Sequence, residues 1–332
     1  MPTTLRWCKW SRAANSWCLA ASWRSTHATN LWRNAPLNLL AQQLINGLFI
    51  GSVYGLFAVG YTLVFGVLDI LNLAHAAVFT LGGLVALWLV QGAGLSIWAA
   101  FPLATCFCGV LGLLLDRIAF APLRQRADSN FAGMISSIAM AIIFESAALA
   151  LFGARTVRFP IGTVQVHLWR MAGVTVTSLQ VEIVVVAIVL MACLTWFLHR
   201  TRTGKAIRAV AENTNTARLL GIHVGGVIAS TFFISSALGG AAGILFGLYF
   251  DALSPDMGRS IELKGLAVII LGGMGSIPGA ILGGLAFGLS EVLTVAITGT
   301  SNLRDAVAFT VLFFILVFRP SGIFGRRHLR EA

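Results

Sequence analysis

Residues Leu39–Val90 read LLAQQLINGLFIGSVYGLFAVGYTLVFGVLDILNLAHAAVFTLGGLVALWLV, with one acidic residue, Asp69, and no lysine or arginine. A predominantly apolar run of about 20 residues is long enough to cross a bilayer as a helix. The block is therefore too long for one crossing and too short for three full crossings. It predicts a protein that is embedded in a membrane.

Two polar or glycine-bounded motifs divide this block, GYTLVFG (Gly60–Gly66) and DILNLAH (Asp69–His75). Glycine favours irregular backbone, and unwound segments occur in transporter helices. We therefore expect one span over 39–58, a short segment over 60–72 and a second span over 73–90.

The whole chain supports the same class. It has 332 residues, of which 58% are hydrophobic and 11% charged, and a mean hydropathy of +0.87. Soluble domains carry about 25% charged residues, so a soluble protein is excluded. Further apolar segments are expected near 97–119, 131–152, 182–198, 224–250, 258–273, 275–298 and 304–319. We predict an all-α, polytopic membrane helix bundle with about eight to ten transmembrane segments, including short Gly-broken helices.

The net charge of +11 comes from basic residues in loops and tails. No basic face with interleaved aromatics is present, so nucleic acid is not an expected partner. Lysine and arginine in short loops mark the cytoplasmic side, which predicts that 120–130, 199–223 and the C-terminal tail are cytoplasmic. Ten crossings would place the basic N-terminus inside as well. Membrane lipid is the expected surrounding.

Three parts are expected along the chain. Residues 1–38 form a Trp/Arg-rich leader, disordered or the product of a wrongly chosen start codon. Residues 39–323 form the transmembrane domain, and 324–332 form a basic cytoplasmic tail. Cys106 and Cys108 have no His or carboxylate at ligand spacing, so no metal site is expected.

Glycines spaced four apart predict close helix packing in lipid. The region 39–90 also resembles the region 224–298 in layout, because each places a Gly-broken short segment after a long span. The second break is LGGMGSIPG (Leu271–Gly279). Paired interrupted segments in two halves indicate a transporter with its path between them.

One polar stretch, GKAIRAVAENTNTARLLGIHV (Gly204–Val224), interrupts the apolar pattern. Its periodicity predicts a weakly amphipathic cytoplasmic helix over 204–221, with a left-handed cap at Gly221. Its narrow apolar face would comprise Ile207, Val210, Ala217 and Leu220. Such a face suits a shallow protein groove better than a lipid surface.

RTRTGKAIRAVAENTNTARLLGIHV (Arg200–Val224) resembles the coupling-helix motif of bacterial ABC permeases of the high-affinity branched-chain amino acid uptake family. Leu44–Gly83 and Leu263–Glu291 resemble two further signatures of its smaller permease subunit. Together they cover most of 39–323. The family commonly has glycine after the histidine of the first signature, and this chain has Ala76.

The resemblance implies an ABC importer permease for branched-chain or related amino acids, in a bacterial inner membrane. It implies a second homologous permease, two cytoplasmic ATPase subunits and a periplasmic amino-acid-binding protein as partners. The chain itself would bind no cofactor and catalyse no reaction, because ATP is used by the ATPase subunits; it has no G-x-x-x-x-G-K-[ST] phosphate loop. The motif positions expected to couple to the ATPase are Gly204, Arg208, Glu212, Ala217 and Gly221.

Polar residues at membrane depth are costly, at about 2.5–3.5 kcal/mol for a charge at a helix centre. Glu145, in AIIFESAALA, is expected either to line the pathway or to make a structural hydrogen bond. Asn72 and His75 lie at the first break, where His75 would contact substrate or cap a helix. The candidate translocation residues are Asn72, His75, Glu145, Gly272, Gly273 and Gly275.

Two other functions stay open from the sequence. An ion-coupled secondary transporter of small solutes would use Glu145 and His75 as relay groups. The same ABC class could instead carry urea, amides or another small solute. An intramembrane enzyme is disfavoured because the chain has no HExxH zinc pair.

Overall fold

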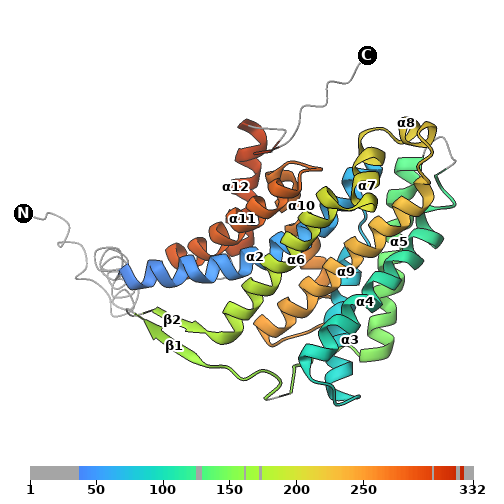
Figure 1. Cartoon of the computed structure of the whole chain (residues 1–332). Coiled ribbons are helices and arrows are strands. Elements are labelled where there is room, and N and C mark those ends of the chain that lie inside the picture. Colours follow the sequence, from blue (N-terminus) through green and yellow to red (C-terminus); the bar gives the residue numbers. More distant parts are fainter. Residues whose placement is uncertain are drawn as a thin grey trace, which may run out of the picture.

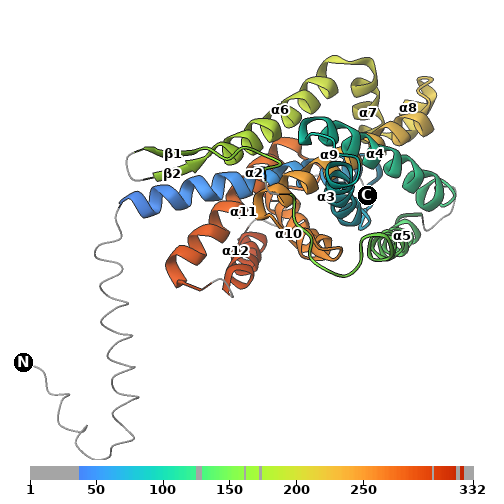
Figure 2. The same cartoon turned by 90° about the horizontal axis from the view of Figure 1, so that it is seen from below.

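The computed structural model describes residues 37–124, 129–160, 162–171, 174–300, 303–318 and 322–324. All of the expected leader before residue 37, and the expected tail after residue 324, lie outside these residues. The described chain is a helix bundle with one small hairpin (Figures 1 and 2). The helices are α2 (Leu37–Leu68), α3 (His75–Gln91), α4 (Ile97–Leu115), the π-helix η1 (Asp116–Phe120), α5 (Ser129–Phe152), α6 (Ser178–Arg200), α7 (Arg202–Glu212), α8 (Thr214–Leu219), α9 (Val224–Phe250), α10 (Met257–Gly272), α11 (Ile277–Thr298) and α12 (Arg304–Phe318). The hairpin pairs β1 (Leu168–Met171) with β2 (Val174–Thr177), antiparallel.

Six of the described helices are long and apolar enough to cross a membrane: α2, α4 with η1, α5, α6, α9 and α11. The helices α3, α10 and α12 are shorter, with 17, 16 and 15 residues. The predicted membrane helix bundle is confirmed, and most predicted segments match a helix to within a few residues. The number of crossings stays a prediction.

The expected break at Gly60–Gly66 is wrong, because α2 runs unbroken through it. In a bilayer the helix satisfies its own backbone groups, so glycine alone does not interrupt it. Gly60 instead allows close packing: a Cβ there would lie 2.9 Å from the carbonyl oxygen of Ser235 on α9. The chain leaves the helix only at 69–74, where Asp69 has a φ of 52°.

The second break is where the sequence places it, between α10 and α11. Ser276 caps α11, accepting a hydrogen bond from the Gly279 amide at 3.2 Å. The expected likeness between the two regions fails, however. The first region forms two helices, α2 and α3, whereas the second forms three, α9, α10 and α11.

The long helix α2 is the centre of the bundle and packs against α11 along a glycine seam (Figure 2). A Cβ at Gly288 would lie 2.5 Å from the Cα of Gly51, and one at Gly284 would lie 2.4 Å from the Cα of Gly55. The predicted role of the four-residue glycine spacing in close helix contact is confirmed at this seam.

The direction of α2 fixes the two ends of the bundle. Near its start, Gln42 Nε2 donates to the Thr175 carbonyl at 3.0 Å, and Gln42 Oε1 accepts from the Thr175 amide at 2.8 Å. Its other end lies by α7 and α8 (Figure 1). We call these the hairpin end and the α8 end. The N-terminus of α2 and the α7–α8 segment therefore lie at opposite ends of the bundle.

Candidate functional site

The polar segment after α6 folds into two short helices rather than the single helix expected over 204–221. The side chain of Thr201 caps α7 by accepting from the Gly204 amide at 3.0 Å. Asn213 has extended backbone, ends α7, and caps α8 by accepting from the Thr216 amide at 2.9 Å. Asparagine is among the preferred residues at helix N-caps, and here it divides the segment.

The left-handed cap expected at Gly221 is present. Gly221 has a φ of 78°, its amide donates to Arg218, and the next amide, of Ile222, donates to Ala217. This pair of hydrogen bonds is a Schellman motif, which suits glycine because it has no Cβ. The motif turns the chain from α8 into α9.

The residues expected to couple to an ATPase occupy different surroundings. Gly204 and Ala217 are buried within the chain, and a Cβ at Gly204 would lie 2.2 Å from the carbonyl oxygen of Phe197. Arg208 Nε donates to the carbonyl of Leu198 at 3.1 Å, which ties α7 to α6. Glu212 and Gly221 are exposed. Arg208 is exposed as well, so three of the five can be reached from outside, whereas Gly204 and Ala217 hold the segment in place.

The exposed surface of α8 carries two leucines. Leu219 is 88% exposed and Leu220 74%, between polar neighbours. The expected placement of Leu220 beside Ile207 is wrong, because Ile207 is buried and Leu220 points outward. The break at Asn213 changes the direction of the helix and thereby the face that Leu220 joins.

The α8 segment also closes a cavity of about 140 Å³ at the α8 end of the bundle. Thr214 and Arg218 contribute from α8, Leu68 from the end of α2 and Ile228 from α9. Arg124, which forms an ion pair with Asp116, lines it as well. A displacement of α8 would therefore act directly on the ends of α2 and α9.

The expected pathway residues Asn72 and His75 are buried. Asn72 Oδ1 accepts from the Ala74 amide at 3.2 Å. The His75 ring has no exposure, and its Nε2 lies 3.3 Å from the Phe57 carbonyl oxygen. A Cβ at Gly239 on α9 would lie 2.7 Å from this ring. Asn72 therefore holds the loop before α3, and the His75 ring fills the space between α2 and α9.

The expected glycines lie in the turn between α10 and α11. Gly273 and Gly275 have positive φ, and Gly272 packs on the Gly279 backbone. The amide of Phe324 donates to the Gly272 carbonyl at 3.0 Å, so the segment after α12 covers the turn. This turn is separated from the start of α10 by about 20 Å of helix.

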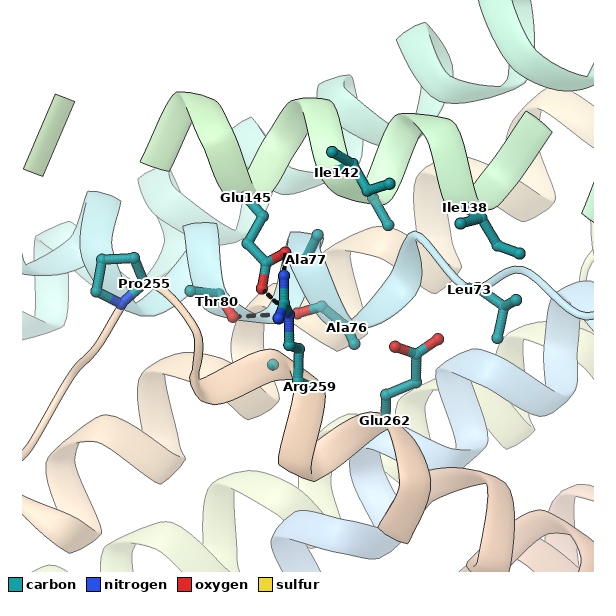
Figure 3. A pocket seen from close by; sticks show the side chains of 12 residues that line it. Leu73, Ala76, Ala77, Thr80, Ile138, Ile142, Glu145, Pro255, Arg259 and Glu262 are labelled. Carbon is teal, nitrogen blue, oxygen red and sulfur yellow. Dashed lines mark hydrogen bonds and ion pairs between the residues drawn. The ribbon is translucent and has the colours of Figure 1, made fainter. Parts of the chain in front are cut away.

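Glu145, the remaining pathway candidate, forms a two-point ion pair. Arg259 Nε lies 2.8 Å from its Oε1 and Arg259 Nη2 lies 2.9 Å from its Oε2 (Figure 3). The pair spans a groove of about 230 Å³ between α3, α5 and α10, and Glu262 points into the same groove. Ala76, where the family pattern has glycine, also lines it. The structure thus separates the six expected pathway residues and leaves Glu145 alone in an open groove.

The sequence did not predict a role for two charged residues, Arg259 and Lys264. Arg259 gave no signal, because its partner Glu145 is far away in the sequence. Lys264 is buried, and its Nζ lies 2.8 Å from Glu291 Oε1 and 3.0 Å from Asp305 Oδ1. A buried lysine is normally paired. The sequence feature that could have indicated its partners is the presence of two acidic residues, Glu291 and Asp305, in or beside apolar segments.

Among the residues that the structure describes, no group of three or more His, Cys, Asp or Glu side chains could hold a metal ion.

Comparison with known proteins gives a consistent result. A family model described as "Branched-chain amino acid transport system / permease component" matches residues 43–316. The chain is 36% identical over 301 residues to the high-affinity branched-chain amino acid transport system permease protein BraD of Pseudomonas aeruginosa, across 87% of this chain and 97% of BraD. It is 34% identical to LivH of Escherichia coli, with the same coverage. It is 27% identical over 283 residues to a probable branched-chain amino acid transport permease LivH of Methanocaldococcus jannaschii, across 81% of this chain and 88% of that protein.

The family match spans α2 to most of α12, and the bundle contains six helices long and apolar enough to cross a bilayer. This multi-pass membrane protein therefore belongs to the permease family of branched-chain amino acid transport systems.

Proposed function

We propose that this chain is one permease of an ATP-binding cassette importer in a bacterial inner membrane. It would carry branched-chain or related amino acids that a periplasmic binding protein delivers. A second homologous permease would complete the pathway, and two cytoplasmic ATPase subunits would drive it. The membership of the family supports this proposal.

The observation that carries the proposal is the α7–α8 segment. An exposed apolar pair, Leu219 and Leu220, stands on a polar helix that cannot lie in hydrocarbon. Exposed apolar patches rimmed by polar residues mark interaction sites. We infer that the pair docks into a groove on an ATPase subunit, which fits the expected coupling role of this segment.

The geometry supports a path for the coupling. Movement of the ATPase would be transmitted to α8 and, through the cavity beneath it, to the ends of α2 and α9. At the same time Gly204 and Arg208 fix α7 to α6. On one side of α8, α7 is fixed to α6, and on the other side lies the cavity. Movement of α8 by the ATPase would therefore rotate the helices that line the cavity. The chain would perform no catalysis itself.

The orientation follows from the charges. The basic segment 199–223 belongs to the α8 end. The positive-inside rule therefore favours a cytoplasmic α8 end and a periplasmic hairpin end. The start of α2 would then be periplasmic.

The ion-coupled alternative needs Glu145 and His75 to act as a relay. His75 is enclosed between α2 and α9, whereas Glu145 is paired with Arg259 in a separate groove. The arrangement therefore favours an ATP-driven mechanism.

The test is leucine uptake into proteoliposomes that hold the complete importer. We expect uptake that requires ATP on the α8 side and the binding protein on the hairpin side, and that survives an ionophore. Uptake that continues without ATP and stops when the ion gradient collapses would overturn the proposal. Urea and small amides in the same assay separate the possible substrate classes.

A further inference from the structure

The groove between α3, α5 and α10 has the chemistry of an amino-acid site. We propose that it holds the head group of an aliphatic amino acid, with Arg259 binding the α-carboxylate and Glu262 the α-ammonium group. The inference rests on the proposed function, because it assigns a substrate contact within the permease. It names the recognition groups, which neither the sequence nor the family match supplies.

Arg259 is available to a second carboxylate. Its side chain is 75% exposed, whereas that of Glu145 is 16% exposed (Figure 3). A guanidinium group prefers two parallel hydrogen bonds to a carboxylate, which is how it holds Glu145. A substrate carboxylate can therefore compete with Glu145 for this guanidinium group.

Glu262 supplies the complementary charge. It lies three residues after Arg259, on the same face of α10, and it lines the groove. Among the ion pairs of the described residues, none includes Glu262. The lining therefore holds two carboxylates and one guanidinium group, so one negative charge is in excess. The ammonium group of an amino acid neutralises that charge, whereas a carboxylate ligand without an amino group does not.

The rest of the lining suits a branched hydrocarbon chain. Ile138 and Ile142 line the groove from α5, the helix that also carries Glu145, and Leu73 lines it from the segment before α3 (Figure 3). The volume of about 230 Å³ is below the roughly 300–1,000 Å³ of sites for drug-sized ligands. Charged groups next to aliphatic groups match an aliphatic amino acid of small size.

The location also fits a substrate that arrives from the hairpin end. Glu145 lies seven residues before the last residue of α5, Phe152, which is about 10 Å along the helix. Arg259 is the third residue of α10, whose preceding loop pairs with the loop after α5 through Leu253 and Val157. A charged side chain this exposed is unfavourable against lipid tails. Arg259 therefore faces water or a polar partner.

The test measures occupancy of the groove directly. Ala141 and Ile138 line it, and each is replaced by cysteine in the complete importer, in membranes. The rate at which a small alkylating reagent modifies that cysteine is followed by peptide mass spectrometry, with and without ligand. We expect leucine to slow the modification of Ala141→Cys and Ile138→Cys several-fold. Isocaproate, which lacks the ammonium group, and isoamylamine, which lacks the carboxylate, should give little protection.

Three variants assign the two ends of the ligand. With Glu262→Gln, half-protection should require about tenfold more leucine or more, since each tenfold is about 1.4 kcal/mol. The same variant should no longer distinguish leucine from isocaproate. With Arg259→Gln, protection should be lost. With Glu145→Gln, half-protection should require less leucine, because the side chain that competes for Arg259 has lost its charge. If the ion pair had only a structural role, half-protection would require more leucine.

Thr214→Cys is the matched control, because Thr214 lines the separate cavity at the α8 end and should show no protection. If leucine fails to protect both groove cysteines, or if Glu262→Gln leaves protection unchanged, the site assignment is wrong. The ATP-driven uptake of leucine by the same importer is measured separately. Uptake without protection would overturn this inference alone, whereas loss of ATP-dependence would overturn the proposed function.

Discussion

Lys264 Nζ on α10 lies 2.8 Å from Glu291 Oε1 on α11, and the Glu291 side chain has no exposure. Asp305 on α12 contributes a second carboxylate 3.0 Å from the same nitrogen. The three charges thereby join three helices. Removal of one partner from a buried pair leaves an uncompensated charge, so this cluster holds the C-terminal helices in register.

The first prediction concerns this cluster. Lys264→Met should lower the free energy of unfolding by about 3–5 kcal/mol, because Glu291 would stay buried without its cation. Thermal unfolding of the purified protein in detergent measures the loss. The double variant Lys264→Met with Glu291→Leu should recover much of it. Arg259→Gln is the control and should lower stability less than Lys264→Met does, since the Arg259 side chain is 75% exposed. Equal unfolding temperatures for wild type and Lys264→Met would contradict this role.

The second prediction concerns the seam between α2 and α11. Gly288→Ala places a Cβ 2.5 Å from the Cα of Gly51, where only backbone could move. Overpacking of this kind costs about 1–3 kcal/mol, so we expect a lower yield of folded protein and a lower unfolding temperature. Gly225→Ala is the matched control: its nearest neighbour would be a flexible His223 side-chain atom at 3.7 Å. A Gly288→Ala protein as stable as Gly225→Ala would refute the close packing.

The apolar composition was enough to predict the bundle, because a membrane helix is specified locally by length and hydropathy. It was not enough to predict where helices break. The segment Gly60–Gly66 was predicted to break the helix, yet in the structure α2 continues through it and Gly60 allows α9 to approach. Sequence spacing cannot distinguish these two uses of glycine, since the difference depends on which helix packs alongside.

The candidate sites show a similar limit. The left-handed helix cap at Gly221 could be predicted from the sequence because it depends on adjacent residues. The pairing of Glu145 with Arg259, and of Lys264 with Glu291, joins residues that are remote in the chain. Only the packing of α5 and α10 on α3, and of α11 against α10, brings them together, so single residues could be suspected but their partners could not be named.

The third prediction concerns the Schellman motif that ends α8. Gly221→Val should strain the backbone, because a β-branched residue is unfavourable at a φ of 78°. Space is available around this position, so the bundle itself should still insert and fold. We expect ATP hydrolysis to be uncoupled from leucine uptake in the assembled importer, measured as uptake per ATP consumed. Gly221→Asn, which tolerates the left-handed region better, should retain more coupling. Full coupling in Gly221→Val would argue against a role for this turn.

The fourth prediction concerns orientation. A cysteine at Val166, in the exposed loop before β1, should react with a membrane-impermeant thiol reagent in intact cells whose outer membrane is permeable. A cysteine at Asn215 on α8, which is also exposed, should react only after the inner membrane is opened. Labelling of both positions in intact cells, or the reverse order, would show that the proposed orientation is wrong.

The most direct test of the account is the identity of the neighbour of Leu219. A photo-activatable cross-linker is attached to Leu219→Cys in native membranes, and the same reagent is attached to Leu149→Cys, an exposed position within α5. We expect Leu219→Cys to form an adduct with a cytoplasmic ATPase subunit, and this adduct to be lost when Leu220 is replaced by aspartate. Leu149→Cys should give no ATPase adduct. Adducts of Leu219→Cys with lipid alone, in an importer that still transports, would contradict the docking of α8 on an ATPase.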